Sequence, residues 1–196
     1  MMKLNNKYYI LRHGEAKSNV ENIVSCWPEK FKNPLTENGK EKIKEAAGQL
    51  KNKNINLIFS SDLLRTKETA EIAGKILGVK VKFDKRLREI GFGTFNSKPA
   101  DDFENYFHNF SDLKDRIKNG APKGENYKDV SKRVFDFLRE INKKYKGKNI
   151  LIVSHQAPII LLRAKIRDAA ILSNIKELGK VFAEKRVTKG ELIELN

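Results

Sequence analysis

Five side chains of the types that bind or transfer phosphate follow short apolar segments of the sequence. Arg12 and His13 come directly after one such segment, Arg65 after a second, Glu89 after a third and His155 after a fourth. In a sheet of mostly parallel strands, ligands bind beyond the carboxyl ends of the strands. The sequence therefore predicts that these five side chains meet at one site.

Phosphoryl transfer is the chemistry that suits this set. The guanidinium groups of Arg12 and Arg65 stay charged and donate paired hydrogen bonds to phosphate oxygens. A neutral imidazole facing the same pocket can attack phosphorus in line and form a phosphohistidine. Glu89, protonated when the substrate binds, can give a proton to the leaving alkoxide and later accept one from water. The set thus predicts a displacement in two steps.

The histidines also have a structural and a metal-binding interpretation. A single histidine after a strand is more often a hydrogen-bonded structural residue, so the prediction depends on all five residues meeting. A metal site formed by His13, His155 and carboxylates is disfavoured, because no pair lies at helical i, i+4 spacing and the one cysteine, Cys26, is isolated. The third histidine, His108, carries no signal of function.

The elements that must position these residues alternate between strand and helix. Asn149–Ser154 is almost continuously apolar, as a central parallel strand covered on both faces must be. Val79–Phe83 alternates between apolar and polar residues, which is typical of a half-exposed strand near an edge. The five predicted strands are Lys7–Leu11, Asn56–Ser60, Val79–Phe83, Asn149–Ser154 and Glu191–Leu195.

Apolar residues at helical spacing predict the helices that pack on this sheet. Residues 91–126 break the alternation with glycines, prolines and an aromatic patch at helical spacing, which predicts a small helical lid. The expected fold is a three-layer α/β/α sandwich with a mostly parallel sheet, in one domain over residues 1–196. The predicted helices are one capped by Thr36 and reaching Leu50, one capped by Ser60, Ser61 or Asp62 and ending at Gly78, one over Tyr127–Ile141, one over Pro158–Ala170, and the lid helix with Phe103, Tyr106, Phe107 and Phe110.

Composition narrows the possible partners. The chain has 196 residues and a net charge of +15, but its lysines are dispersed and alternate with glutamates, so nucleic acid is not expected as a partner. No apolar run approaches the length of a membrane span, and the polar start does not resemble a secretory signal. A single cysteine agrees with a reducing compartment, so we expect a cytoplasmic protein that takes an anionic small molecule.

Six motifs of the sequence resemble those of the histidine phosphatase superfamily, the phosphoglycerate mutase-like proteins. They occur in the family's order between about residues 7 and 163, which makes the resemblance specific. The motifs are Ile10-Leu11-Arg12-His13-Gly14-Glu15 with Asn19, Leu35-Thr36-Glu37-Asn38-Gly39, the segment 59–70 with Arg65, Arg88-Glu89-Ile90-Gly91-Phe92-Gly93, Gly124-Glu125-Asn126 and Val153-Ser154-His155.

The resemblance implies a role for each matching residue. His13 would be the nucleophile that becomes phosphorylated, with its other ring nitrogen fixed by the Gly14 carbonyl, and Glu89 would be the proton donor. No metal or organic cofactor is implied, because arginines supply the positive charge. The residues implied to surround or contact the phosphoryl group are Arg12, Asn19, Arg65 and His155.

Two positions depart from the family's pattern. Gln156 stands where glycine commonly follows the second histidine, and its amide can narrow the pocket or bind the substrate. Cys26 replaces a small residue before Trp27. The chain is also short where the family's mutases carry insertions, which favours a phosphomonoesterase of the histidine acid phosphatase type that hydrolyses a small organic phosphate. The alternatives are a phosphoglycerate mutase and a non-catalytic anion-binding or regulatory module.

Overall fold

Five strands form one mixed sheet in the computed structural model, which describes residues 3–108, 118–167 and 187–196. The order across the sheet is β3-β2-β4-β1-β5; the first four are parallel, and β5 pairs antiparallel with β1. The predicted central place of the strand at 149–154 and the predicted edge place of the strand near 81 are both confirmed. The strands are β1 (Lys7–Arg12), β2 (Leu57–Ser60), β3 (Val81–Phe83), β4 (Asn149–Ser154) and β5 (Leu192–Glu194).

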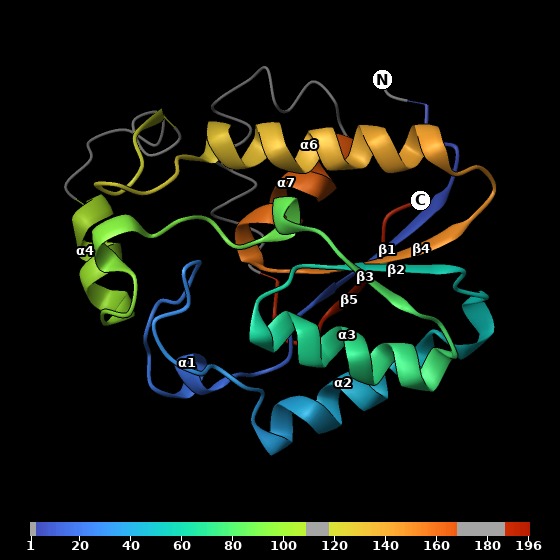
Figure 1. Cartoon of the computed structure of the whole chain (residues 1–196), viewed down its shortest axis with the longest axis horizontal. Helices are drawn as coiled ribbons and strands as arrows, with labels where there is room; N and C mark the ends of the chain where they lie inside the picture. The colour runs from blue at the N-terminus through green and yellow to red at the C-terminus, as the bar shows by residue number, and fades with distance from the viewer. Residues whose placement is uncertain (1–2, 109–117, 168–186) are drawn as a thin grey trace.

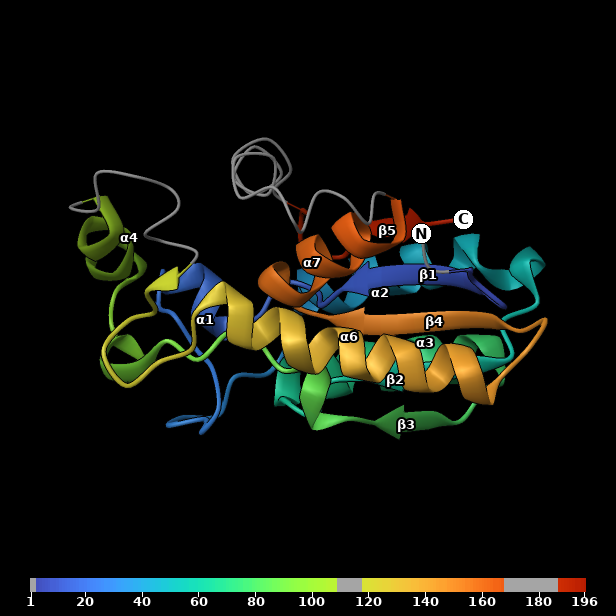
Figure 2. The ribbon, with the colours of Figure 1, turned by 90° about the horizontal axis from the view of Figure 1, so that it is seen from above.

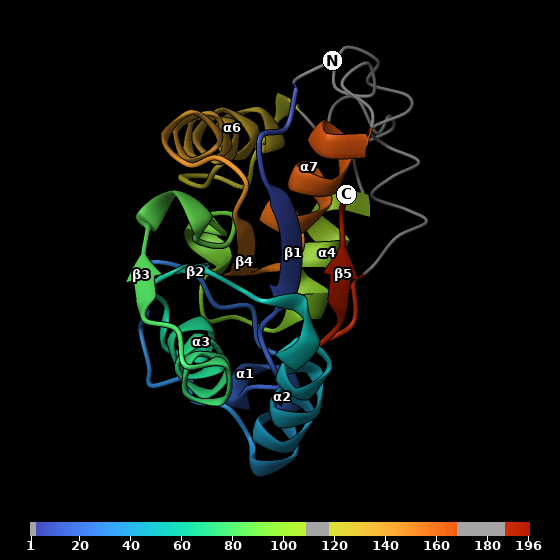
Figure 3. The ribbon, with the colours of Figure 1, turned by 90° about the vertical axis from the view of Figure 1, so that its right-hand side faces the viewer.

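Side chains of β4 enter two different cores, because successive residues of a strand point to opposite faces. Ile150 and Ile152 belong to the core that includes α6 (Tyr127–Lys144) and α7 (Gln156–Arg167). Leu151 and Val153 belong to the core that includes α2 (Glu37–Gln49) and α3 (Leu64–Leu77). Figure 3 shows these two helix pairs on opposite faces of the sheet. The predicted three-layer α/β/α architecture is confirmed.

The helix ends follow the sequence signals in two cases. Thr36 caps α2, since its Oγ1 accepts a hydrogen bond from the Gly39 N–H at 2.9 Å. Gly78 ends α3 at φ 68°, a left-handed conformation that glycine adopts without steric cost.

Two predicted helix starts are wrong. Helix α3 begins at Leu64 after the apolar Leu63, and not at a cap formed by Ser60, Ser61 or Asp62. Its first N–H, that of Leu64, donates to Glu29 Oε2 at 3.1 Å, so a distant loop replaces the local cap. Helix α7 begins at Gln156, two residues before Pro158, and the end predicted for it at residue 170 lies outside the described residues.

A helix of aromatic character lies beyond the carboxyl ends of the parallel strands. This is α4 (Ala100–His108), which stands apart from the sheet at the end toward which the arrow of β4 points (Figure 1, Figure 2). Phe103 has its ring centroid 4.8 Å from that of Phe92 and 4.9 Å from that of Phe107. The predicted lid helix is confirmed over these residues, while Phe110 lies outside the described part.

Short elements complete the described parts of the chain. None of the helices described there is both long and apolar enough to cross a membrane. The short elements are α1 (Lys17–Val20) and the 3-10 turns η1 (Lys51–Lys53), η2 (Lys85–Leu87) and η3 (Gly93–Phe95).

Candidate active site

His13 and His155 lie side by side at the carboxyl ends of two paired strands. Arg12 of β1 stands opposite Ser154 of β4, so the residues that follow each of them are neighbours. The His13 N–H donates to the Ser154 carbonyl at 3.1 Å. The two imidazole centroids are 5.2 Å apart, and both side chains are buried. The structure therefore brings the two predicted histidines into one environment.

Hydrogen-bond partners on both sides of the His13 ring fix its tautomer. Nδ1 lies 2.8 Å from the Gly14 carbonyl oxygen, which can only accept, so Nδ1 carries the proton. Nε2 receives a hydrogen bond from Arg65 Nε at 3.3 Å, so Nε2 carries the lone pair. The neutral ring thus directs its unprotonated Nε2 toward Arg65, the cation predicted to bind the phosphate.

Close backbone packing holds the loop that carries His13 against α2. A Cβ atom added to Gly14 would lie 2.8 Å from the Gly39 carbonyl oxygen and 2.9 Å from Ile43 Cγ1, nearer than real Cβ atoms come. The Gly14 N–H also donates to Thr69 Oγ1 of α3 at 3.1 Å. Any side chain at position 14 would push the loop away from both helices and move His13.

Arg65 is a nearly fully buried cation in the first turn of α3. Its Nη2 donates to the Ser25 carbonyl at 2.9 Å, and its Nη1 lies 3.7 Å from Glu29 Oε1. The positive end of the helix dipole adds to the attraction of this region for an anion. Ser25 and Glu29 were not predicted as neighbours of the site.

Burial and neighbouring cations keep both histidines neutral. Burial lowers the pKa of His13 well below its ordinary value, and the charges of Arg65 and Arg12 lower it further. Burial likewise lowers the pKa of His155, with Arg65 as the next largest cause. A neutral imidazole is the form that acts as a nucleophile.

We expect the free energy of unfolding to fall as the pH is lowered below about 6.5, the ordinary pKa of histidine. Below that pH the unfolded chain binds protons that the folded chain, with its lowered histidine pKa values, does not yet bind. Each such histidine contributes a slope of up to about 1.4 kcal/mol per pH unit. Urea unfolding between pH 7 and 5 measures this slope, and His155→Gln should reduce it. An equal slope in the variant would contradict the prediction.

Ser61 is a neighbour of the site that sequence reasoning missed. Its Oγ lies 2.9 Å from His155 Nε2, while His155 Nδ1 is buried without a hydrogen-bond partner among the described residues. The signal was available, because Ser61 directly follows β2 and therefore lies at the same edge of the sheet.

The carboxylate of Glu89 lies at the start of α7, where it binds the backbone of the two residues that follow His155. Its Oε1 accepts hydrogen bonds from the N–H groups of Ile90 at 2.9 Å and Ala157 at 3.2 Å, and its Oε2 accepts one from Gln156 at 3.1 Å. These bonds satisfy the first donors of α7 and explain why the helix starts before Pro158. The Gln156 side-chain Oε1 is buried and has no hydrogen-bond partner in the described parts of the chain.

A clamp from α6 holds the segment that carries Glu89. Arg133 donates to the carbonyls of Arg86 and Arg88 at 2.7 Å and of Glu89 at 3.0 Å. The same guanidinium makes two hydrogen bonds of 2.8 Å to Glu125, whose Oε2 also accepts from the Gly91 N–H at 2.8 Å. The predicted acid is thus fixed from its backbone as well as from its carboxylate.

The remaining predicted residues differ in their closeness to the histidines. Arg12 donates to the Val187 carbonyl and is near enough to lower the pKa of His13 and His155. Asn19 uses its Oδ1 to accept the Ala16 N–H at 3.0 Å, at the start of α1, and makes no hydrogen bond to either histidine within the described parts of the chain.

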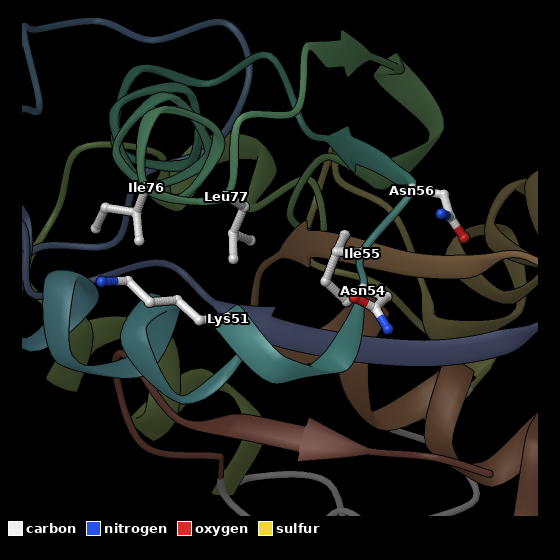
Figure 4. Close-up of a pocket in the computed structure, with 6 residues that line it drawn as sticks. All are labelled: Lys51, Asn54, Ile55, Asn56, Ile76 and Leu77. Carbon is white, nitrogen blue, oxygen red and sulfur yellow. The ribbon is translucent and has the colours of Figure 1, made fainter.

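A surface hollow elsewhere on the molecule is separate from this site. Lys51, Asn54, Ile55, Asn56, Ile76 and Leu77 line it (Figure 4). Asn56 directly precedes β2 and Leu77 ends α3, so the hollow lies at the amino ends of the strands. The histidines lie at the opposite end of the sheet.

The sequence matches a family profile over most of its length. The profile is that of the histidine phosphatase superfamily (branch 1), and the match covers residues 8–177. A curated relative from Escherichia coli O1:K1 / APEC, "Probable phosphoglycerate mutase GpmB", is 32% identical over 152 residues, which are 75% of this chain and 68% of the relative.

Solved structures of similar fold cover nearly the whole chain. The alpha-ribazole phosphatase from Shigella flexneri has a TM-score of 0.75 at 26% identity, covering 95% of this chain and 88% of its own. YhfR from Bacillus stearothermophilus has a TM-score of 0.79 at 26% identity, covering 95% and 89%. A mycobacterial glucosyl-3-phosphoglycerate phosphatase has a TM-score of 0.80 at 22% identity, covering 97% and 90%, and at that identity supports the fold alone.

Proposed function

Because this chain belongs to the histidine phosphatase superfamily, we propose that it is a phosphomonoesterase that hydrolyses a small organic phosphate through a phosphohistidine on His13. The observation that carries the proposal is the fixed tautomer of His13, whose Nε2 lone pair faces Arg65. The similarity to the alpha-ribazole phosphatase structure supports hydrolysis.

In the first step, Nε2 of His13 attacks phosphorus in line and the bond between phosphorus and the ester oxygen breaks. Arg12, Arg65 and His155 hold the phosphoryl oxygens, and Glu89 gives its proton to the leaving alkoxide. In the second step, water attacks the phosphohistidine, the P–N bond breaks, and Glu89 takes a proton from the water. The products are an alcohol and inorganic phosphate, with His13 and Glu89 restored.

Other side chains are proposed to bind the substrate around this centre. Gly14 orients His13 through its carbonyl, and Asn19 reaches the phosphoryl group once the substrate is bound. The amide oxygen of Gln156, which has no partner among the described contacts, accepts a hydrogen bond from a donor group of the substrate. Tyr106 and Phe107 of α4 contact the leaving group and help to set specificity.

Ser61→Ala is expected to lower kcat for p-nitrophenyl phosphate about tenfold or more while leaving the fold intact. The Ser61 hydroxyl lies 2.9 Å from His155 Nε2, and we propose that it donates to that nitrogen. The proton of the ring would then lie on Nδ1, which has no other partner among the described residues and would be the nitrogen that donates to phosphate. Ser61→Thr keeps the hydroxyl and should restore part of the rate. Steady-state kinetics of the three proteins test this, and equal kcat values in all of them would contradict it.

The second candidate function is phosphoglycerate mutase, which the curated relative favours by its name. A screen of phosphosugars, nucleotides and phosphoglycerates, with release of inorganic phosphate as the readout, tests the phosphatase. A coupled assay with and without a bisphosphate primer tests the mutase. We expect phosphate release from at least one monoester. Primer-dependent isomerisation without phosphate release would instead establish the mutase.

The proposed partner is therefore a phosphorylated small molecule. The single cysteine supports a reducing compartment, so we also propose a cytoplasmic location.

A further inference from the structure

A carboxylate that the proposed reaction does not use lies against the phosphate-binding arginine. Glu29 Oε1 is 3.7 Å from Arg65 Nη1, and Glu29 Oε2 accepts the N–H of Leu64 at the start of α3 at 3.1 Å. The side chain of Glu29 is 19% exposed and that of Arg65 is 4% exposed, so water screens their interaction only partly.

Hydrogen bonds fix the residues that come directly before Glu29. Asn96 Oδ1 accepts the N–H of Cys26 at 3.1 Å, and Asn96 Nδ2 donates to the Pro28 carbonyl at 2.8 Å. The Ser25 carbonyl accepts from Arg65 Nη2 at 2.9 Å. Glu29 is therefore held beside Arg65 by the fold of the loop and not by the ion pair alone.

Only one nitrogen of the Arg65 guanidinium lacks a hydrogen bond among the described residues. Nε donates to His13 and Nη2 to Ser25, whereas Nη1 is buried and has no such partner. Nη1 is thus the donor best placed to bind a phosphoryl oxygen, and Glu29 Oε1 lies 3.7 Å from it. The charge of Glu89, the proposed proton donor, also acts on Arg65. An anion at Nη1 would be attracted by Arg65 and repelled by Glu29.

We propose that Glu29 limits the affinity of the site for phosphate, so that the charge of Arg65 is partly offset and the inorganic phosphate product is held weakly. The inference rests on the proposed function, because it assigns Arg65 to the phosphoryl group. The proposed effect of Glu29 is electrostatic. Its Oε2 also caps α3, but Glu29→Gln removes only the charge, because the amide oxygen can still accept the Leu64 N–H.

Calorimetric titration with inorganic phosphate tests this proposal without requiring turnover. Glu29→Gln is expected to bind phosphate at least about tenfold more tightly than the wild type, since like charges a few ångströms apart repel strongly where water is scarce. Glu29→Asp keeps the charge one methylene farther away, so its affinity should lie between those of the wild type and Glu29→Gln. Glu71→Gln removes an exposed charge from the same helix, away from Arg65, and should bind phosphate like the wild type.

The titration measures the effect of the Glu29 charge on phosphate affinity, independently of hydrolysis. The order wild type, Glu29→Asp, Glu29→Gln in rising affinity supports the proposal. Unchanged or weaker binding in both variants, or an equal gain in Glu71→Gln, would overturn it. Circular dichroism shows whether each variant is folded, and Glu29→Asp alone still decides the matter if Glu29→Gln does not fold. The phosphatase proposal fails separately, through the absence of hydrolysis.

Discussion

Replacing His13 with alanine is expected to lower kcat for p-nitrophenyl phosphate by at least about 10³-fold, because removal of the nucleophile ends covalent catalysis. The His13 ring is fixed by a partner on each nitrogen, and its unprotonated Nε2 can form the bond to phosphorus once it gives up the hydrogen bond from Arg65. Residual activity would come from binding by Arg12 and Arg65 alone. Steady-state kinetics with the purified variant measure the loss.

The control for this prediction is His108→Ala, which changes the exposed third histidine at the end of α4 and should retain kcat within about twofold. Rapid acid-free quenching during turnover should trap a phosphohistidine in the wild type and none in His13→Ala. Hydrolysis by His13→Ala at the wild-type rate would disprove the mechanism.

Glu89→Gln is expected to slow the hydrolysis of an alkyl phosphate by about 10²- to 10⁴-fold, the usual contribution of a general acid. The loss should be much smaller for p-nitrophenyl phosphate, since p-nitrophenolate is a weak base that leaves without a proton. Kinetics on the two substrates, compared as a ratio, measure the effect.

The structure also explains why this substitution should not disrupt the fold. The amide oxygen of glutamine can still accept an N–H at the start of α7, and the Arg133 clamp binds the backbone of residue 89 and not its side chain. Thermal unfolding should therefore stay close to the wild type. Equal losses on both substrates would show that Glu89 is not the proton donor to the leaving group.

The sheet and the placing of the two histidines were predictable from the sequence for one physical reason. Parallel strands buried on both faces are continuously apolar, and the residues just after them lie at one edge of the sheet. This rule predicted that His13 and His155 lie together although more than 140 positions separate them in the sequence, as the structure shows. Applied more fully, it would also have found Ser61, which follows β2.

The contacts made by the irregular segment between α1 and α2 were not predictable. Ser25 and Glu29 reach Arg65 through backbone turns that no hydrophobic period marks. The start of α3 was misplaced for the same reason, since the oxygen that satisfies its first N–H comes from Glu29 and not from a neighbouring residue. Local sequence signals cannot reveal a cap supplied from 35 positions away.

The contacts of Val187 and Gly190 affect when the site can form during synthesis of the chain on the ribosome. Arg12 donates to the Val187 carbonyl, and the Gly190 N–H donates to the carbonyls of Arg12 and His13 at 3.2 and 3.1 Å. The surroundings of the first residues of the site to leave the ribosome therefore stay incomplete until residue 190 has been synthesised. A nascent chain that stalls before that point would carry His13, the proposed nucleophile, without the hydrogen bond from Gly190 to its carbonyl.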